Sequence, residues 1–264
     1  SVIEEDRRDC LSTVPHFSRT WKVIMKKWSE KYFINAHDTD FNRVVSVSGL
    51  LRYMQDAVNF QMENAHPSYN ELFDSGLAFV LSRIRISIYA ALHSHDEIEV
   101  ETWACESHGV SFNRCYRVLR DGAIVAEAVS VWALLDTKTH KLRRVSSVDF
   151  DYGDGEMLEL DSPTRIRIPQ DAELSLVGEH RVEYAEVDIN RHLNNTYYAD
   201  IFAGYIHEID GERISSIGIS YLSEAPLGEN LKIYMREIDG IYYFRSVKED
   251  GTTNAEAEII VDQL

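Results

Sequence analysis

The sequence predicts an α+β protein built from two copies of one unit, in which a long helix packs on an antiparallel β-sheet. Three observations lead to this fold class. Two segments have the apolar spacing of an amphipathic helix, and a series of runs with alternating apolar and polar residues, typical of strands, follows each. The two series also resemble each other in order and in sequence. Two such units can lie side by side and share one continuous sheet.

The first unit opens with a predicted strand over 19–35, where apolar and polar residues alternate. A helix is expected over 48–65, and a short second helix over 69–75. The apolar stripe of the long helix consists of Leu50, Leu51, Met54, Val58 and Met62. Strands are then expected over 78–90, 96–107, 110–120, 123–136 and 141–145. Asp121 and Gly122 lie between two alternating runs, which predicts a hairpin turn.

A polar segment over about 146–175, rich in Asp, Glu, Gly and Pro, separates the two units. We therefore expect an N-terminal domain over 1–150, a linker over 151–175 and a C-terminal domain over 176–264. The second unit repeats the order of the first, with a strand over 179–186, a loop over 187–193 and a helix over 195–209. Its later strands are expected over 213–225, 229–237, 240–249 and 253–261.

The internal repeat is visible in the residues themselves. Segments 40–44, 96–100 and 121–128 match segments 188–192, 229–233 and 250–257 in the same order. A repeat of this length indicates a duplicated domain, because its period far exceeds that of solenoid repeats. The copies differ at two ionisable positions, since Val44 replaces His192 and Ala91 replaces Glu224. We therefore expect the second copy to be the catalytic half and the first copy to have another role, such as holding substrate.

Bulk composition excludes several classes. The chain of 264 residues is 44% hydrophobic and 27% charged, a globular balance, and its net charge of −17 argues against a nucleic-acid partner. No apolar run approaches the roughly 20 residues that span a membrane. Residues 1–19 have no signal-peptide core, and the start at Ser1 leaves open a preceding Met or longer leader. Cys10, Cys105 and Cys115 form no CxxC motif, which favours a reduced compartment and buried, inert thiols.

Asp188, Asn190 and His192 form the strongest candidate site. In an extended segment, side chains at alternate positions point the same way, so these three are expected to face one site. An imidazole titrates near neutrality and suits acid–base work. Asn194 and Asn195 are favoured helix N-cap residues, and a helix start offers free N–H groups to an oxyanion.

Two points leave the roles of these residues open. Asp40 and Asn42 occupy the places of Asp188 and Asn190 in the first copy, which equally fits a structural role in turning the loop. Glu224 stands at the end of a strand-like run, where an exposed Glu is common. Within reach of the imidazole, its carboxylate would act as a base or a nucleophile. The chain has no GxSxG, HExxH or GxGxxG motif, and the histidines at 93 and 95 suit a solvated loop better than a metal site.

The segments 188–195 and 221–225 resemble the acyl-acyl carrier protein thioesterases of plants and bacteria. The family pattern is Asp-x-Asn-x-His-x-Asn-Asn followed by a Tyr-x-x-Glu-Cys-like segment, and this chain has Tyr221, Glu224 and then Ala225. The resemblance extends over nearly the whole chain, including the run 51–57. Ala225 in place of the family's Cys argues against a Cys nucleophile at this position.

The resemblance implies a tandem hot-dog fold, with two long helices each packed on an extended antiparallel sheet. It implies hydrolysis of fatty acyl-acyl carrier protein to free fatty acid, which terminates chain elongation in fatty acid biosynthesis, without metal or cofactor. The implied catalytic residues are Asp188, Asn190, His192 and Glu224. Glu224 would activate water or attack directly, His192 and Asn190 would hold the substrate or the water, and Asp188 would orient them. The implied substrate-binding residues are Met54, Val58 and Phe60 along the acyl chain, and Asn194 and Asn195 at the oxyanion.

Acyl carrier proteins are acidic, so an acidic enzyme needs a local basic patch to bind them. The candidates are Arg83 with Arg85, the run 138–144, and Arg165 with Arg167. Without such a patch, acyl-CoA becomes the stronger substrate candidate. The alternatives are an acyl-CoA thioesterase of the same fold and a non-catalytic acyl-binding protein. The sequence leaves a homodimer open, and it favours a bacterial cytoplasm, or the plastid stroma if a transit peptide has been removed.

Overall fold

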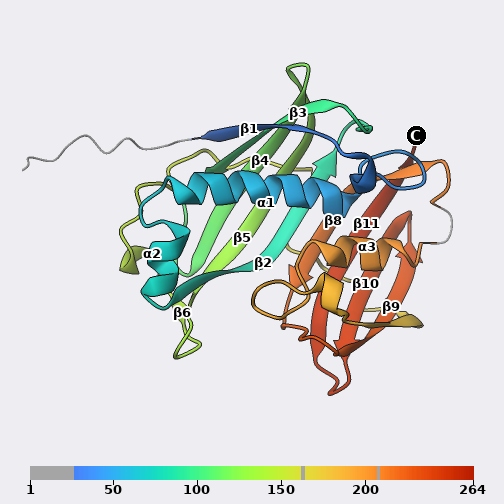
Figure 1. The fold of residues 1–264 in the computed structure, drawn as a ribbon. Coiled ribbons are helices and arrows are strands. Elements are labelled where there is room, and N and C mark those ends of the chain that lie inside the picture. The colour runs from blue at the N-terminus through green and yellow to red at the C-terminus, as the bar shows by residue number, and fades with distance from the viewer. Residues whose placement is uncertain (1–26, 162–163, 207–208) are drawn as a thin grey trace, which may run out of the picture.

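Within the residues that the structure describes, one antiparallel sheet of eleven strands extends through both halves (Figure 1). The computed structural model describes residues 27–161, 164–206 and 209–264. Their strands follow the order β1-β3-β4-β5-β2-β8-β11-β10-β9-β7, and β6 pairs with β5. Strands β2 and β8 join the two halves, with Arg83 opposite Ser220 and Ser87 opposite Ser216. The α+β architecture of two similar units sharing a continuous sheet is therefore confirmed.

The first half follows the predicted order closely. Its elements are β1 (Trp28–Phe33), α1 (Val47–Glu63), α2 (Tyr69–Asp74), β2 (Leu77–Ile88), β3 (Glu97–Ala104), β4 (Ser111–Arg120), β5 (Ala123–Asp136) and β6 (Leu142–Arg143). The predicted hairpin is confirmed, because Asp121 and Gly122 both have positive φ, 53° and 77°. The part of the first predicted strand before residue 27, together with Cys10, lies outside the described residues.

The second half contains β7 (Ser175–Arg181), α3 (Tyr197–Ala203), β8 (Glu212–Tyr221), β9 (Asn230–Ile238), β10 (Ile241–Lys248) and β11 (Thr253–Gln263). The prediction of a second long helix over 195–209 is wrong, because α3 has only seven residues. Glycine favours helix ends, and Gly204 caps this one. Tyr205 then turns onto β7, where its hydroxyl donates a hydrogen bond to the Glu179 carbonyl at 3.2 Å.

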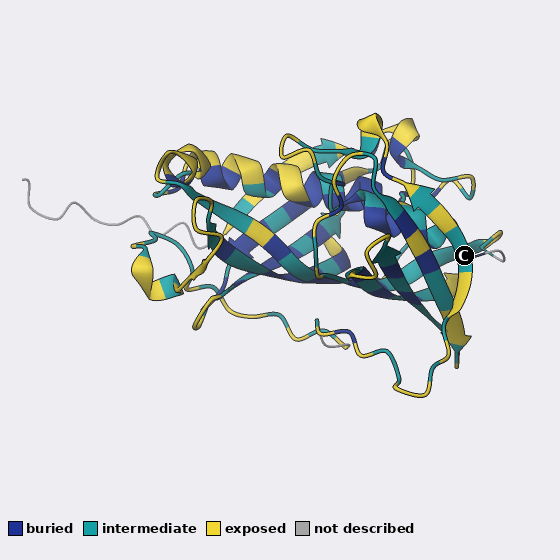
Figure 2. Cartoon of the chain, turned by 90° about the horizontal axis from the view of Figure 1, so that it is seen from below, coloured by how far each residue is buried: buried dark blue, intermediate teal, exposed yellow. Residues whose placement is uncertain are grey.

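Helix α1 lies along the concave face of the first half. Its N-cap, Ser46, accepts a hydrogen bond from the Gly49 N–H at 3.1 Å. Leu50, Met54 and Ala57 are buried against the sheet, whereas the opposite side of the helix is exposed (Figure 2). The core of the molecule therefore lies between the helices and the sheet, as expected for an amphipathic helix on one sheet face.

The segment that connects the two halves crosses the face of the sheet opposite the helices (Figure 2). The Trp103 indole donates to the Glu156 carbonyl at 2.7 Å, and Leu158 and Leu160 pack against Trp103 and its neighbours. Cys105 and Cys115 are buried beneath this segment as free thiols, as the sequence predicted. From Glu156 on, the connection thus covers the outer face of the sheet, whereas Phe150 and Tyr152 at its start pack with Met62 of α1.

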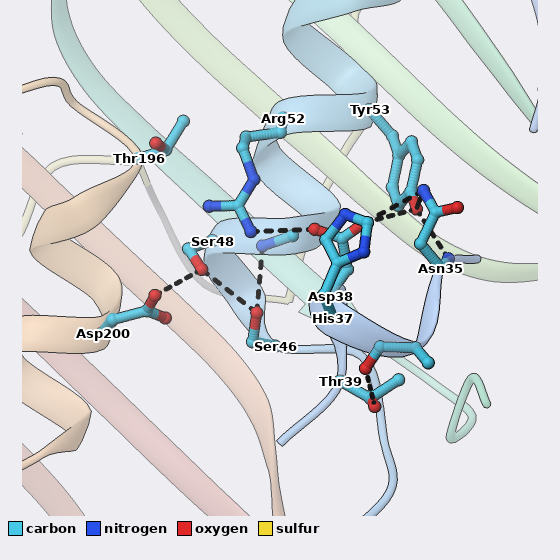
Figure 3. A network of polar contacts seen from close by, with 12 residues as sticks. Asn35, His37, Asp38, Thr39, Ser46, Ser48, Arg52, Tyr53, Thr196 and Asp200 are labelled. Atoms are coloured by element: carbon cyan, nitrogen blue, oxygen red, sulfur yellow. Dashed lines mark hydrogen bonds and ion pairs between the residues drawn. The ribbon is translucent and has the colours of Figure 1, made fainter. Parts of the chain in front are cut away.

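A polar network at the start of α1 fixes this helix to its surroundings (Figure 3). The buried carboxylate of Asp38 accepts hydrogen bonds from the Tyr53 hydroxyl at 2.7 Å and from the Arg52 guanidinium at 2.9 Å. On the other side of the helix, the Ser48 hydroxyl donates to the Asp200 carboxylate of α3 at 2.5 Å. The network therefore connects the helices of the two halves.

We expect Asp38→Asn to lower the free energy of unfolding by about 1–3 kcal/mol at neutral pH. Burial opposes ionisation of Asp38, but hydrogen bonds from Tyr53 and Arg52 outweigh it and lower the pKa of the carboxyl. The stabilisation is therefore present above the unfolded-state pKa of about 3.9 and is lost as pH falls through the lower folded-state pKa. Denaturant unfolding at several pH values should show the difference from wild type shrinking in acid. The exposed Asp74→Asn is the control, and equal stability of both variants would contradict the prediction.

Candidate active site

The segment 187–193 forms a tight turn that carries the candidate residues. The Asp188 N–H donates to the His192 carbonyl at 3.0 Å, and the Arg191 N–H donates to the Asp188 carbonyl at 2.9 Å. Arg191 has a φ of 66°. The prediction of an extended segment is therefore wrong, and alternation does not explain how the side chains are placed. Asp188, Asn190 and His192 nevertheless line one cavity, because the turn presents them to it.

The first copy folds into the same turn. The Asp40 N–H donates to the Val44 carbonyl at 2.8 Å, and Arg43 has a φ of 64°. The residue after each turn then bonds to the opposite strand end in the same way, Val45 to Leu92 and Leu193 to Ala225, both at 2.8 Å. The residues before these two acceptors, Ala91 and Glu224, are thus equivalent, as the repeat predicted. A cavity of ≈ 190 Å³ beside Val44 and Ala91 occupies the corresponding place in the first copy.

Asn42 and Asn190 occupy equivalent positions but make different contacts. The Asn42 amide donates to the carbonyls of Ile209 and Glu212 at 2.7 and 2.9 Å and accepts from the Gly211 N–H at 3.1 Å. Asn42 therefore holds the loop 209–212 of the other half in place, which is a structural role. Within the described residues, the Asn190 amide contacts only the Asp188 carboxylate, at 3.4 Å. The rest of its hydrogen-bonding capacity is available to a ligand.

His192 and Glu224 lie next to each other in the wall of the cavity. The distance between His192 Nε2 and Glu224 Oε2 is 3.4 Å. Strand β8 ends at Tyr221, earlier than predicted, because Leu222 and Ser223 both donate to the Asn254 carbonyl, which ends the regular ladder. Glu224 therefore lies in the turn after the strand, and its side chain is 62% exposed. The carboxylate reaches the imidazole, as the sequence suggested it could, but it is open to solvent rather than buried.

The start of α3 differs from the prediction in its capping residue. The N-cap is Thr196, and the Asn194 side chain accepts from the Thr196 N–H at 3.0 Å. The Asn194 N–H is bound to the Glu186 carbonyl at 2.9 Å. Of the N–H groups of Asn194, Asn195 and Thr196 at this helix start, only that of Asn195 has no partner in the described part of the chain. Tyr221, to which the sequence assigned no role, donates its hydroxyl to the Asn195 carbonyl at 2.9 Å and so holds this backbone in place.

A cavity of ≈ 1370 Å³ extends from the turn into the first half. Its volume exceeds the roughly 300–1,000 Å³ that is common for small-molecule sites. Met54 and Val58, two of the residues expected along the acyl chain, line it, and so do the two asparagines that precede α3. Phe60 does not, and its side chain is 45% exposed. Two residues along a helix turn the side chain by about 200°, so Phe60 faces away from Val58 and towards solvent.

The described residues contain no group of three or more His, Cys, Asp or Glu side chains placed to bind a metal ion. Within the same residues, no helix is both long enough and apolar enough to cross a membrane. The groups that line the cavity around the turn include the carboxylates of Asp188 and Glu224, the His192 imidazole and the side-chain amides of the asparagines.

The sequence matches the two domain models of one known family over most of its length. Residues 25–150 match the family model described as the acyl-ACP thioesterase N-terminal domain, and residues 169–263 match the corresponding C-terminal domain. The chloroplastic oleoyl-acyl carrier protein thioesterase 2 of Arabidopsis thaliana is 23% identical over 221 residues, 75% of this chain and 59% of the relative. A chloroplastic palmitoyl-acyl carrier protein thioesterase of Cuphea hookeriana is 21% identical over 218 residues, 74% of this chain and 51% of the relative. The chain thus spans between half and three-fifths of the length of these relatives.

Solved structures share the same architecture. An acyl-ACP thioesterase from Bacteroides thetaiotaomicron superposes with a TM-score of 0.82 at 21% identity, covering 90% of this chain and 98% of the other. The 12:0-ACP thioesterase from Umbellularia californica superposes with a TM-score of 0.78 at 17% identity, with the same coverage. This likeness confirms the tandem hot-dog fold expected from the sequence.

Proposed function

The chain belongs to the acyl-ACP thioesterase family, and we propose that it hydrolyses fatty acyl-acyl carrier protein to free fatty acid, thereby ending chain elongation in fatty acid biosynthesis. One observation carries the proposal. His192 and Glu224 approach within 3.4 Å in the wall of a cavity of ≈ 1370 Å³ that is also lined by residues of α1 in the first half. The thioester would lie at this pair, and the acyl chain would extend into the first half past Met54 and Val58.

In the proposed mechanism, Glu224 removes a proton from water as the water attacks the carbonyl carbon. A C–O bond forms, the C–S bond breaks, and the proton passes to the departing thiolate. His192 and Asn190 hold the water and the thioester, and Asp188 orients Asn190 by accepting its backbone N–H at 2.8 Å. The Asn195 N–H stabilises the oxyanion, because a fixed donor aimed at developing charge lowers the barrier.

The decisive assay compares thioesters of the same acyl chains on acyl carrier protein and on coenzyme A, with release of free fatty acid as the readout. We expect turnover of the carrier-linked series with a clear preference for some chain lengths. Turnover of acyl-CoA alone would reassign the substrate to the acyl-CoA thioesterase alternative. Tight acyl binding without turnover of either series would contradict the hydrolase and favour an acyl-binding protein.

The carrier partner is supported by the placement of the basic residues. Arg85 is fully buried and paired with Glu258, so it is not available on the surface. Arg165 and Arg167 lie on the connection between the two halves. By contrast, the basic residues of the run 138–144 are exposed beside Thr137 and His140, which line the cavity. This run supplies the local positive surface that an acidic carrier requires.

We expect Lys138→Glu combined with Lys141→Glu to raise KM for acyl carrier protein thioesters by about tenfold at low salt, with little change in kcat. The effect should shrink as salt is added, because exposed charges are screened. KM for acyl-CoA should change much less, since coenzyme A lacks the carrier's protein surface. Arg165→Glu with Arg167→Glu is the matched control for the change in net charge. An equal effect of the two double variants would refute docking at the run 138–144.

Two observations bear on the compartment in which the protein works. The curated relatives are chloroplastic proteins, which is compatible with a plastid stroma. The free thiols of Cys105 and Cys115 fit a reducing compartment of either kind, including a bacterial cytoplasm.

A further inference from the structure

Arg114 is a buried cation in the wall of the cavity. It lies on β4 with 6% of its surface exposed, and it is one of the lining residues. Its Nη1 donates to the Gln61 side chain of α1 and to the Thr102 hydroxyl of β3, the latter at 3.1 Å. In the described part of the chain no carboxylate pairs with it, and its Nε and Nη2 have no hydrogen-bond partner. The cation is thus held in place by neutral groups and keeps donors for a ligand.

A second polar group lies near Arg114 without a partner. The Tyr152 hydroxyl is buried, and among the described residues nothing forms a hydrogen bond with it. Gly153, the next residue, lies against the Cys105 carbonyl, and Ala104 pairs with Arg114 across β3 and β4, which places Tyr152 near Arg114. Burial raises the pKa of the Tyr152 hydroxyl, and the Arg114 charge partly offsets the rise. Tyr152 also lines the cavity. The cavity wall therefore contains one cation with unused donors, and beside it a tyrosine whose hydroxyl is buried without a partner among the described residues.

This part of the cavity is remote from the catalytic turn. Leu51 belongs to the apolar cluster that contains Leu193 of the turn, whereas Tyr152 packs with the separate cluster around Met62. Gln61, which holds Arg114, follows Leu51 by ten residues on α1, which corresponds to roughly 15 Å along the helix axis. A group bound by Arg114 would therefore lie well along the acyl chain, away from the thioester.

A plain hydrocarbon chain is a poor match for the Arg114 cation. It would displace water from Arg114 and offer no acceptor, and a buried donor without an acceptor is costly. An oxygen atom on the chain would accept from Arg114, and a carboxylate would also neutralise the charge. We propose that the cavity accepts acyl chains that carry a hydroxyl or carboxylate group in their distal half, bound by Arg114. The inference rests on the proposed function, because it takes the cavity as the acyl site.

The test measures ligand binding separately from hydrolysis. Wild type is titrated calorimetrically with medium-chain fatty acids of equal length that are unsubstituted, ω-hydroxylated or ω-carboxylated. We expect the oxygenated chains to bind at least about tenfold more tightly, and Arg114→Met to abolish or reverse that order. Arg117→Met is the control, because Arg117 lies on the same strand and is bound to Glu127 instead. Arg114→Lys keeps a cation, so it should retain part of the preference for the carboxylate if Arg114→Met fails to fold.

The outcomes separate the two proposals. Equal or tighter binding of the unsubstituted chain by wild type would overturn the inference, even if carrier-linked plain chains were hydrolysed. An oxygenated-chain preference that depends on Arg114, without hydrolysis of any thioester, would support the binding site and overturn the proposed reaction.

Discussion

Glu224→Gln should reduce the rate of thioester hydrolysis by about 10²–10⁴-fold, the range typical for loss of a general base. Glutamine keeps the size and the hydrogen-bonding capacity of the side chain but does not take a proton from water. Because Glu224 is largely exposed, the substitution should leave stability almost unchanged. Substrate binding should also persist, since the cavity beyond the turn is untouched.

Single-turnover release of fatty acid, measured beside substrate affinity and thermal unfolding, tests this expectation. His192→Ala should lower the rate to a similar degree, and the double variant should lose little more than the more damaging single change, because both groups act on one step. Glu249→Gln, an exposed glutamate on the hairpin between β10 and β11, is the control. If Glu224→Gln retains more than about a tenth of wild-type activity, Glu224 is not the base.

The duplicated frame was predictable from the sequence because duplication preserves local chemistry. Asp40 and Asp188 begin matching turns in the structure, and the fourth residue of each turn is an Arg with positive φ. That match alone aligns Ala91 of the first copy with Glu224 of the second, without any three-dimensional information. The α+β class and the tandem fold were correct for the same reason, and the family resemblance was correct because segments 188–195 and 221–225 carry the family pattern.

Other features depend on contacts between distant residues and were not predictable from local pattern. The direction of Asp188, Asn190 and His192 was inferred from alternation, but the backbone forms a turn whose geometry depends on hydrogen bonds within it. The length of α3 depends on Gly204 and on the contact of Tyr205 with β7. Arg114 lies in an alternating strand like many surface arginines, and only the packed structure shows that it faces the cavity.

The joint between the two halves contains a second buried arginine. Arg85 of β2 stands opposite Gly218 of β8, where a Cβ atom would lie 2.5 Å from the guanidinium carbon. Glycine therefore makes room for the side chain at the joint. The guanidinium, 1% exposed, pairs with Glu258 of β11. Strand β11 thus contributes the carboxylate, β8 contributes the glycine that leaves space, and β2 contributes the arginine. The ion pair therefore spans both halves of the sheet.

Glu258→Leu should therefore lower the free energy of unfolding by about 3–5 kcal/mol, because it removes the carboxylate from a buried charge. Glu256 provides a control on the same strand, since it pairs with Arg245 at 2.7 Å but that arginine is 40% exposed. Glu256→Gln should cost no more than about 1 kcal/mol, the range of surface ion pairs. Denaturant unfolding of both variants measures the difference. Adding Arg85→Met to Glu258→Leu should recover part of the lost stability, because the double variant no longer has a buried charge without a partner at this place. Equal losses of stability in Glu258→Leu and Glu256→Gln would show that the burial of Arg85 does not determine the effect.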